Sequence, residues 1–348
     1  MPRRSRILAA ALAAIAALVV GLLAGQAGAA QVKPPANVKG LKILLTNDDS
    51  VQGVKADGED GKGLYELRKA LCAAGADVIV VGPWGQQSGQ GGRITTSRTA
   101  GLTVTKATVP EAYAGDCASA ASAGPVYGVC NSNTACVADS PSASPADTVR
   151  IGVKNFLPAT YWPKGPDVVL TGINWGQNVG TVVTHSGTTN AAVTAHELGV
   201  PAIAFSEALP SDIGDLIACA TQGIGCPEYT AAAAFGVKLL GKVRGAGLLK
   251  PSTLLNVNYP HLADGQKVGK PVLNVLGNGD MTELAWSGSA TKDGATYSLG
   301  IPTDRKSTNK NADTEALRAG KISIVPMDGD WTLSAAPKSL QAIVKALG

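Results

Sequence analysis

The chain has 348 residues, with 30 Lys and Arg against 26 Asp and Glu and a formal net charge of +4. Three of the basic residues lie within residues 1–30, so the rest of the chain carries 27 − 26 = +1. This near neutrality excludes an electrostatic case for binding a nucleic-acid polymer. The remaining length of about 310–320 residues allows one large α/β domain or two small ones.

Residues 1–30 have the composition of a secretory signal peptide. A basic start is followed by the Ala-rich apolar run Ile7–Ala24 and by the small residues Ala27–Ala30. The run is nearly long enough to cross a bilayer, so an uncleaved anchor is the alternative. We expect cleavage after the small residues, a secreted or extracytoplasmic protein and no stable membrane anchor. Residues 31–39 are predicted to be a linker, and the paired arginines leave the export route open.

Six cysteines follow this segment, and an even number in an exported chain favours disulfides. A zinc site is the alternative, but the chain has no C-x-x-C motif and only three histidines. By spacing, the local candidates for pairing are Cys219 with Cys226 and one pair among Cys117, Cys130 and Cys136, whereas Cys72, on a predicted helix, is a candidate for a free buried thiol.

The first structural elements are a strand, a helix and a second strand. Leu41–Thr46 is apolar apart from one lysine, as in a strand covered on both faces. Leu64, Leu67 and Leu71 recur at helical spacing, and Val78–Val81 is again a buried strand. This order indicates a right-handed βαβ unit and therefore a parallel sheet.

The pattern continues, so we expect a single α/β domain over residues 40–348. Residues 112–145 are rich in Ala, Ser, Gly, Pro and Cys and are predicted to be a surface insertion. The further predicted elements are a helix over Ala146–Phe156, a strand over Asp167–Thr171, a helix from about Thr188 to Leu198, a strand over Ala202–Ser206, a helix over Tyr229–Val243, a strand over Leu254–Asn258 and shorter β segments beyond Pro271, including Ile322–Val325.

The first predicted strand runs directly into Asn47, Asp48 and Asp49. Two adjacent carboxylates repel each other, and a site that contains them usually holds a cation. Hard divalent cations such as Mg²⁺ or Mn²⁺ accept all-oxygen ligands. In open α/β sheets, ligands bind at the carboxyl ends of the strands. The sequence therefore predicts one divalent ion per subunit at this strand end.

Two further loops complete the predicted site. Ser88 follows the second strand, and Asn174 follows the strand over Asp167–Thr171. Together with the two aspartates they form an oxygen-only metal shell of Asp48, Asp49, Ser88 and Asn174. Ser186-Gly187-Thr188 opens a helix whose free N–H groups can hold an anion. A cation beside an anion site indicates phosphate-ester hydrolysis, although the spacing alone equally allows an α/β binding protein.

Several motifs, in the same order, closely resemble the signatures of the SurE family of 5′/3′-nucleotidase-type phosphatases. They cover nearly all of the chain after the signal segment. They are Ile-Leu-Leu-Thr-Asn-Asp-Asp at Ile43–Asp49, Gln-Ser-Gly at Gln87–Gly89, Ser-Pro-Ala-Asp-Thr-Val at Ser144–Val149, Gly-Ile-Asn-Trp-Gly-Gln-Asn-Val-Gly at Gly172–Gly180, His-Ser-Gly-Thr at His185–Thr188 and the segment Asp313–Met327.

The resemblance implies a Rossmann-like three-layer α/β/α fold with a mainly parallel sheet. It also implies a C-terminal β extension used in oligomerisation, which favours a homodimer or homotetramer. The metal ligands would be the same four residues, and the substrate a nucleoside 5′- or 3′-monophosphate or a related small phosphomonoester. The sequence does not distinguish direct water attack from an aspartyl-phosphate intermediate, although we favour water.

Catalytic roles follow from these positions. Asp48 and Asp49 would hold the ion, and one of them would orient or deprotonate water. His185 is a candidate to protonate the leaving oxygen, or it is bonded within its loop. The candidates for gripping the phosphate are Asn47, Asn178, Ser186, Gly187 and Thr188. Trp84 and Trp175 are candidates for stacking on a base or for packing under the loops.

Two departures from the family pattern concern the first loop. Ser50 follows the aspartates where the family usually has glycine, and the polar stretch Val51–Lys62 is longer than usual. Family members are mostly intracellular, whereas this chain has a predicted signal peptide. The alternatives to a nucleotidase are an exported, non-catalytic nucleotide- or metal-binding protein and a broad-specificity acid phosphatase. A Ser-His-Asp hydrolase lacks support, because no G-x-S-x-G motif is present.

Overall fold

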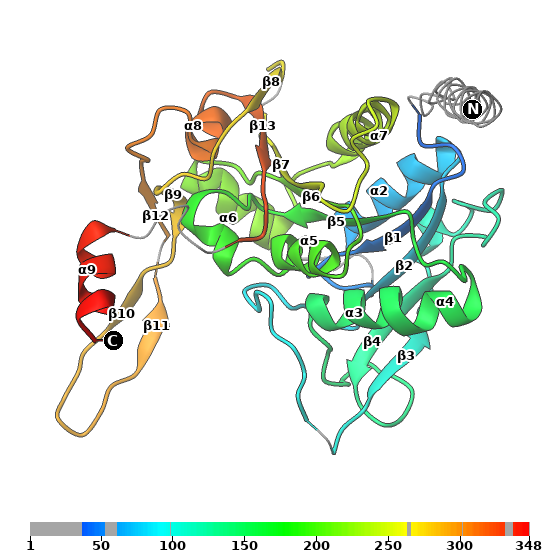
Figure 1. Cartoon of the computed structure of the whole chain (residues 1–348), viewed down its shortest axis with the longest axis horizontal. Coiled ribbons are helices and arrows are strands. Elements are labelled where there is room, and N and C mark those ends of the chain that lie inside the picture. Colours follow the sequence, from blue (N-terminus) through cyan, green and yellow to red (C-terminus); the bar gives the residue numbers. More distant parts are fainter. Residues whose placement is uncertain are drawn as a thin grey trace, which may run out of the picture. The chain divides into compact units, whose positions relative to one another are not determined.

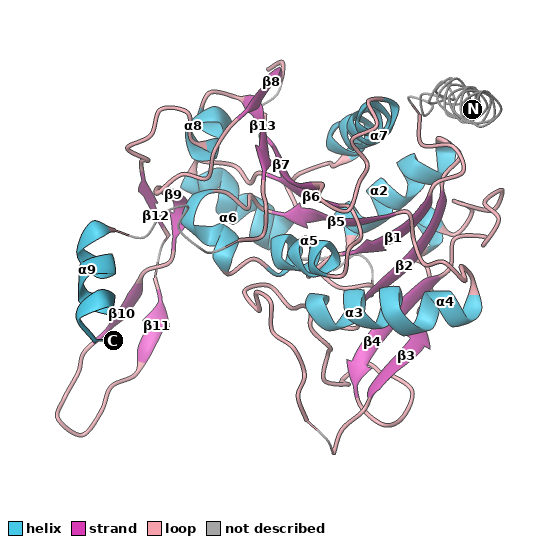
Figure 2. Cartoon of the chain, in the orientation of Figure 1, coloured by secondary structure: helices cyan, strands magenta, loops and turns pink. Residues whose placement is uncertain are grey.

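A mostly parallel β-sheet forms the centre of the computed structural model, which describes residues 37–52, 61–97, 99–262, 266–300, 302–330 and 337–347 (Figures 1 and 2). In this part of the chain the strand order is β3-β4-β2-β1-β5-β6-β7-β13-β8. β3 is antiparallel to β4 and β13 is antiparallel to β7, while the other neighbours are parallel. The strands are β1 (Lys42–Thr46), β2 (Asp77–Pro83), β3 (Leu102–Lys106), β4 (Val126–Asn131), β5 (Val168–Trp175), β6 (Ala202–Glu207), β7 (Leu254–Tyr259), β8 (Gly269–Leu273) and β13 (Lys321–Pro326).

Helices cover both faces of this sheet, as Figure 2 shows. α2 (Lys62–Ala73) and α7 (Thr230–Gly245) lie on one face, and α3 (Pro145–Ile151) and α5 (Gly187–Glu197) lie on the other. Successive side chains of a strand point to opposite faces. Thus Ile43 of β1 is buried against α2 and α7, whereas its neighbour Leu44 is buried against the α3 and α5 side. The sequence prediction of a three-layer α/β/α fold is confirmed.

The remaining elements are short helices and small strand pairs. β9 pairs with β12 and β10 pairs with β11, both antiparallel, and these pairs form the C-terminal β extension. No helix among the described residues is long and apolar enough to cross a bilayer. The predicted signal peptide lies outside the described residues. The bounds are η1 (Glu111–Tyr113), η2 (Gly152–Phe156), α4 (Leu157–Thr160), η3 (Gly180–Thr184), α6 (Ile213–Gln222), β9 (Asp280–Glu283), β10 (Trp286–Gly288), β11 (Tyr297–Leu299), β12 (Thr303–Arg305), α8 (Asp313–Arg318) and α9 (Lys338–Leu347).

The strand order reverses between β1 and β5. From β1 the chain adds β2 and β4 on one side, and it then returns to add β5, β6 and β7 on the other side. Such a switch point opens a crevice outside the carboxyl ends of the two strands, because the following loops diverge there. The loops after β1 and β5 are therefore the positions at which a ligand is expected in a sheet of this topology.

Most predicted elements are present, but one prediction about the segment 112–145 is wrong. Residues 126–131 form β4, which is inserted in the sheet between β2 and β3 and buries Val126 and Val129 completely. Its composition resembles a loop, yet its pairing with β2 gives it the environment of a core strand. The parts of the segment before and after β4 are turns and loops.

All six cysteines lie in close pairs. The sulfur atoms are 1.97 Å apart in Cys72–Cys117, 2.13 Å in Cys130–Cys136 and 2.02 Å in Cys219–Cys226. Two of these pairs are among those that the spacing predicted. Cys72 is not the free thiol that its helical position suggested, because the loop after η1 folds back onto α2. The buried guanidinium of Arg68 on α2 holds this loop by donating to the carbonyl of Gly124.

Candidate active site

The first strand delivers two buried carboxylates to the switch point. Asp48 and Asp49 are 3% and 2% exposed. Both oxygens of Asp48 accept hydrogen bonds from Thr188 at the start of α5, from its hydroxyl at 2.5 Å and from its backbone N–H at 3.1 Å. Burial raises the pKa of Asp48, and these hydrogen bonds lower it in part. The first strand and α5 therefore meet at this carboxylate.

Asp49 is held by the neighbouring strand and by Asn47. Its Oδ2 accepts from the Asn47 side-chain amide at 2.7 Å and from the backbone N–H of Trp175, on β5, at 2.9 Å. Among the described residues, its Oδ1 accepts only from the Gln86 side chain, at 3.4 Å. Burial, and then the adjacent charge of Asp48, hold the pKa of Asp49 well above its usual range. Oδ1 is therefore the carboxylate oxygen with the most unused capacity to accept a hydrogen bond.

Three oxygen acceptors surround one hydroxyl between β1 and β5. The Oγ1 of Thr188 lies 3.0 Å from Asn47 Oδ1, 2.5 Å from Asp48 Oδ1 and 2.9 Å from Asn174 Oδ1. The amide of Asn174 is oriented by donation to the carbonyls of Trp175 and Gly176, so its oxygen points to this cluster. A hydroxyl has one proton and can donate fully to one acceptor at a time. The cluster thus contains more acceptor oxygens than donors, which is the chemistry of a site for a hard cation.

The N-terminus of α5 touches Asp48 because residue 187 is glycine. The helix is capped by Ser186, whose hydroxyl accepts from the backbone N–H of Thr189 at 3.0 Å. A Cβ atom on Gly187 would lie 2.8 Å from Asp48 Oδ2 and 2.9 Å from its Cβ. Only glycine allows this approach. It brings the backbone N–H of Thr188 into hydrogen-bonding distance of Asp48 and places the positive end of the helix dipole at the carboxylate edge of the site.

Ser88 lies in a loop that contacts both aspartates, but its own side chain is exposed. The backbone N–H of Gln87 donates to the carbonyl of Asp48 at 2.8 Å, and the side chain of Gln86 reaches Asp49. The sequence interpretation named Ser88 and missed the two glutamines, although they stand in the same polar motif. Among the described residues, Ser88 has no side-chain hydrogen bond to the aspartates or to Asn174.

The other predicted substrate residues lie at different distances from this cluster. The side chain of Asn178 donates to Ser206, and its backbone accepts from Asn256 and Asn258, so it belongs to a buried network at the ends of β6 and β7. His185 is exposed, and its carbonyl accepts from the backbone N–H of Gly91 at 3.0 Å. His185 therefore joins the loop of Ser88 to the start of α5.

The two loop tryptophans are in packed positions. The indole N–H of Trp84 donates to the carbonyl of Val137 at 2.7 Å, and its ring covers Gly128 on β4. Trp175 is half-buried against the core on the α2 side. The packing alternative accounts for both side chains.

Within the described residues, no group of three or more His, Cys, Asp and Glu side chains could hold a metal. Only two residues of the candidate shell are acidic, and the remaining oxygens come from amide and hydroxyl groups. Such a shell suits Mg²⁺ or Mn²⁺, which accept neutral oxygen ligands and water. It does not suit a softer metal, which prefers thiolate or imidazole.

Comparisons with known proteins agree with this arrangement. The family described as "Survival protein SurE" matches residues 43–278. The chain is 32% identical to the 5′-nucleotidase SurE of Geotalea uraniireducens over 84% of its length and 94% of the relative, and 32% identical to that of Desulfitobacterium hafniense over 84% and 92%. The crystal structure of the SurE protein from Aquifex aeolicus has a TM-score of 0.60 and 25% identity, covering 87% of this chain and 99% of that one. With its motifs in register and its fold shared, this chain belongs to the SurE family.

Proposed function

We propose that the protein is a divalent-metal-dependent phosphomonoesterase that hydrolyses nucleoside 5′- or 3′-monophosphates to a nucleoside and phosphate. The observation that carries this proposal is the cluster of acceptor oxygens at the β1–β5 switch point, beside the N-terminus of α5. The cluster suits a cation, and the helix terminus suits the phosphate anion. The relatives named 5′-nucleotidase SurE support nucleotides as the substrates.

The ligands of the metal would be Asp48, Asp49, Asn174 and Ser88, with one Mg²⁺ or Mn²⁺ ion per subunit. The surplus of oxygen acceptors around the Thr188 hydroxyl fits such an ion. When bound, the ion supplies Lewis-acid stabilisation of charge on the phosphate. Ser88, whose side chain is exposed, lies on a loop that contacts both aspartates through Gln86 and Gln87.

The chain's own groups provide the remaining parts of the reaction. The positive end of the α5 dipole, with Ser186, Gly187 and Thr188, attracts and orients the phosphate, while Asn47 and Asn178 keep the surrounding loops in place. Asp49 Oδ1 accepts a hydrogen bond from the attacking water, because it has the weakest existing partner. A ring nitrogen of His185 donates its proton to the ester oxygen of the leaving nucleoside as the P–O bond breaks. Water attacks directly in this scheme.

We further propose that the protein is exported, with three disulfides, and that it forms a homodimer or homotetramer. The signal-like composition of residues 1–30 and the close pairing of all six cysteines support export. Exposed apolar side chains on the β extension and on α9 support self-association: Leu284, Trp286, Tyr297, Leu299, Leu340, Ile343 and Val344. N-terminal sequencing of the exported protein and its mass in solution test these two statements.

The test of the activity is release of phosphate from a panel of nucleoside 5′- and 3′-monophosphates. EDTA should abolish release, and added Mg²⁺ or Mn²⁺ should restore it. Asp48→Asn and Asn174→Ala should each lower kcat/KM by about a hundredfold or more, since each weakens the binding of the ion that would polarise the reacting phosphate. Asp167→Asn is the matched control, because Asp167 binds the N–H of Lys42 at the opposite edge of the sheet. Full activity of both site variants would refute the assigned site, and release unaffected by EDTA would favour a metal-independent acid phosphatase.

A further inference from the structure

The loop that carries Ser88 is anchored from outside the site. It begins at Trp84, directly after β2. The backbone N–H of Trp84 donates to the carbonyl of Val129 on β4 at 3.0 Å. The N–H of Gly85 then donates to the hydroxyl of Ser142 at 3.1 Å. The next residues, Gln86 and Gln87, are those that contact Asp49 and Asp48. Whatever fixes the start of this loop therefore also fixes its approach to the two carboxylates.

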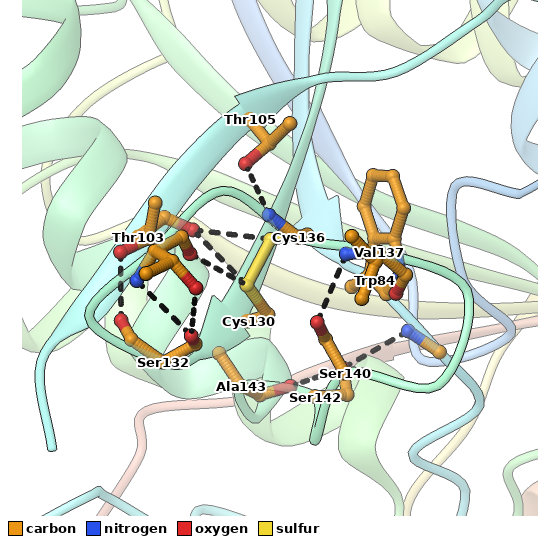
Figure 3. Close-up of a disulfide and its surroundings, with 12 residues drawn as sticks. Trp84, Thr103, Thr105, Cys130, Ser132, Cys136, Val137, Ser140, Ser142 and Ala143 are labelled. Carbon is orange, nitrogen blue, oxygen red and sulfur yellow. Dashed lines mark hydrogen bonds between the residues drawn. A yellow bond between two sulfur atoms is a disulfide. The ribbon is translucent and has the colours of Figure 1, made fainter.

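The side chain of Trp84 makes the shortest of these anchoring hydrogen bonds. Its indole N–H donates to the carbonyl of Val137 at 2.7 Å. Figure 3 shows Trp84 and Val137 near the Cys130–Cys136 pair. Its ring lies over Gly128, where a Cβ atom would come within 2.4 Å of the ring. The indole is thus sandwiched between β4 and the turn after Cys136, and its only donor group is used there.

The acceptor of this hydrogen bond is not held by packing. The side chain of Val137 is 66% exposed. Two hydrogen bonds of 2.9 Å close its turn. The backbone N–H of Val137 donates to the Ser140 hydroxyl, and the backbone N–H of Ser140 donates to the Val137 carbonyl. The preceding residue, Cys136, is joined to Cys130 on β4 and donates its N–H to Thr105 on β3 at 2.9 Å. The hydrogen bond from Ser140 orients the carbonyl of Val137, and the covalent link of Cys136 to β4, with its hydrogen bond to Thr105, ties this turn to the sheet in front of Trp84.

We propose that the Cys130–Cys136 disulfide and Trp84 together position the Ser88 loop over the metal site, with Trp84 as the positioning residue. The disulfide ties the turn of Val137 to the sheet, the Val137 carbonyl fixes the indole, and the indole sets the path of residues 85–88 toward the aspartates. A preorganised loop pays less ordering entropy when its residues bind an ion. The inference rests on the proposed function in placing Ser88 at the metal.

Two variants test the coupling without relying on activity. Trp84→Phe keeps the ring and removes the donor, and Cys130→Ala/Cys136→Ala removes the covalent link without burying a new polar group. The matched control is Cys219→Ala/Cys226→Ala, which opens a loop of similar length, with sequence separation 7 against 6. Among the described residues, no hydrogen bond joins residues 84–92 to residues 219–226.

The measurements are amide hydrogen exchange of residues 85–92 in the metal-free protein and the affinity for Mn²⁺ by calorimetry. In Trp84→Phe we expect exchange of this loop to be faster, and Mn²⁺ to bind more weakly, by about fivefold, as the loss of one hydrogen bond implies. The Cys130→Ala/Cys136→Ala variant should bind Mn²⁺ more weakly by about tenfold or more. Saturating Mn²⁺ should return kcat in Trp84→Phe to within about twofold of the original protein, because only positioning is impaired.

Several results would overturn the proposal. Unchanged exchange in residues 85–92 of Trp84→Phe would do so, as would equal changes in the Cys219/Cys226 control. Faster exchange with an unchanged Mn²⁺ affinity would also overturn it, because the loop would then be anchored without affecting the site. If the double cysteine variant does not fold, the exchange and Mn²⁺-binding data of Trp84→Phe decide whether the proposal holds. A wild-type protein that releases no phosphate contradicts the proposed function, whereas the exchange and binding data still decide this inference.

Discussion

A buried acid next to the site makes the stability of the fold depend on pH. Glu207 ends β6 and pairs in register with Trp175, yet its side chain is only 8% exposed. Its Oε2 has no hydrogen-bond partner among the described residues. Burial raises the pKa of Glu207 from 4.5 to about 7, although the backbone N–H groups of Tyr229 and Glu228 oppose the rise. The perturbation we consider is Glu207→Gln, which keeps the shape and removes the charge.

The sign follows from proton binding in the two states. Because the folded protein binds this proton more tightly than the unfolded chain, the stabilisation is fully present below about pH 4.5 and is lost as the pH rises to about 7. A tenfold difference in proton affinity is worth about 1.4 kcal/mol, so the loss across this range is about 3 kcal/mol. The variant has no such loss. We therefore expect Glu207→Gln to match the original protein near pH 4.5 and to exceed it by about 3 kcal/mol near pH 8.

Urea unfolding of the metal-free, disulfide-intact protein at several pH values from 4 to 8.5 measures this difference. Glu197→Gln on α5 is the control, because the side chain of Glu197 is 54% exposed and forms a surface ion pair with Arg150. Such a pair contributes at most about 1 kcal/mol, so this control should keep the pH dependence of the original protein. If the stability difference between Glu207→Gln and the original protein is the same at pH 4.5 and at pH 8, the reasoning about burial is wrong.

Two predictions concern the backbone around Asp48. Gly187→Ala places a methyl group 2.8 Å from Asp48 Oδ2, so α5 must move away. We expect a loss of about 1–3 kcal/mol in urea unfolding and weaker Mn²⁺ binding by calorimetry; binding and stability equal to the original protein would contradict the close approach. Ser50 has a φ of +92°, in the region that favours glycine. Ser50→Gly should therefore stabilise the fold by about 0.5–1 kcal/mol in urea unfolding. A decrease in stability would contradict this, because the hydrogen bond from the N–H of Gln52 to the Ser50 hydroxyl would then outweigh the strain.

The sequence predicts most of the central strands because the residues of each strand themselves show that both of its faces are buried. A strand covered on both faces needs a continuous apolar run, and β1, β2, β5 and β6 have one. β4, Val-Tyr-Gly-Val-Cys-Asn, has Ala, Ser, Pro and Gly on both sides, and it becomes a core strand only through its pairing with β2. The pair Cys72–Cys117 is likewise non-local, because it depends on how the loop after η1 folds onto α2. Composition therefore identifies strands with an apolar run of their own, and it misses a strand such as β4 that is buried only through its pairing with a neighbouring strand.

The candidate site divides in the same way. The ends of β1 and β5 are visible in the sequence, and because these strands flank the switch point, Asp48, Asp49 and Asn174 had to meet. Their orientation was not visible in the sequence. It depends on the Thr188 hydroxyl, which contacts Asp48 and Asn174, and on Asn47, whose side-chain amide donates to Asp49. Asn178 illustrates the converse. It lies in a matching motif, yet Ser206 at the end of β6 takes its side-chain amide. A motif therefore predicts which strand end a residue occupies, whereas the hydrogen bonds of neighbouring strands decide whether its side chain faces the reaction.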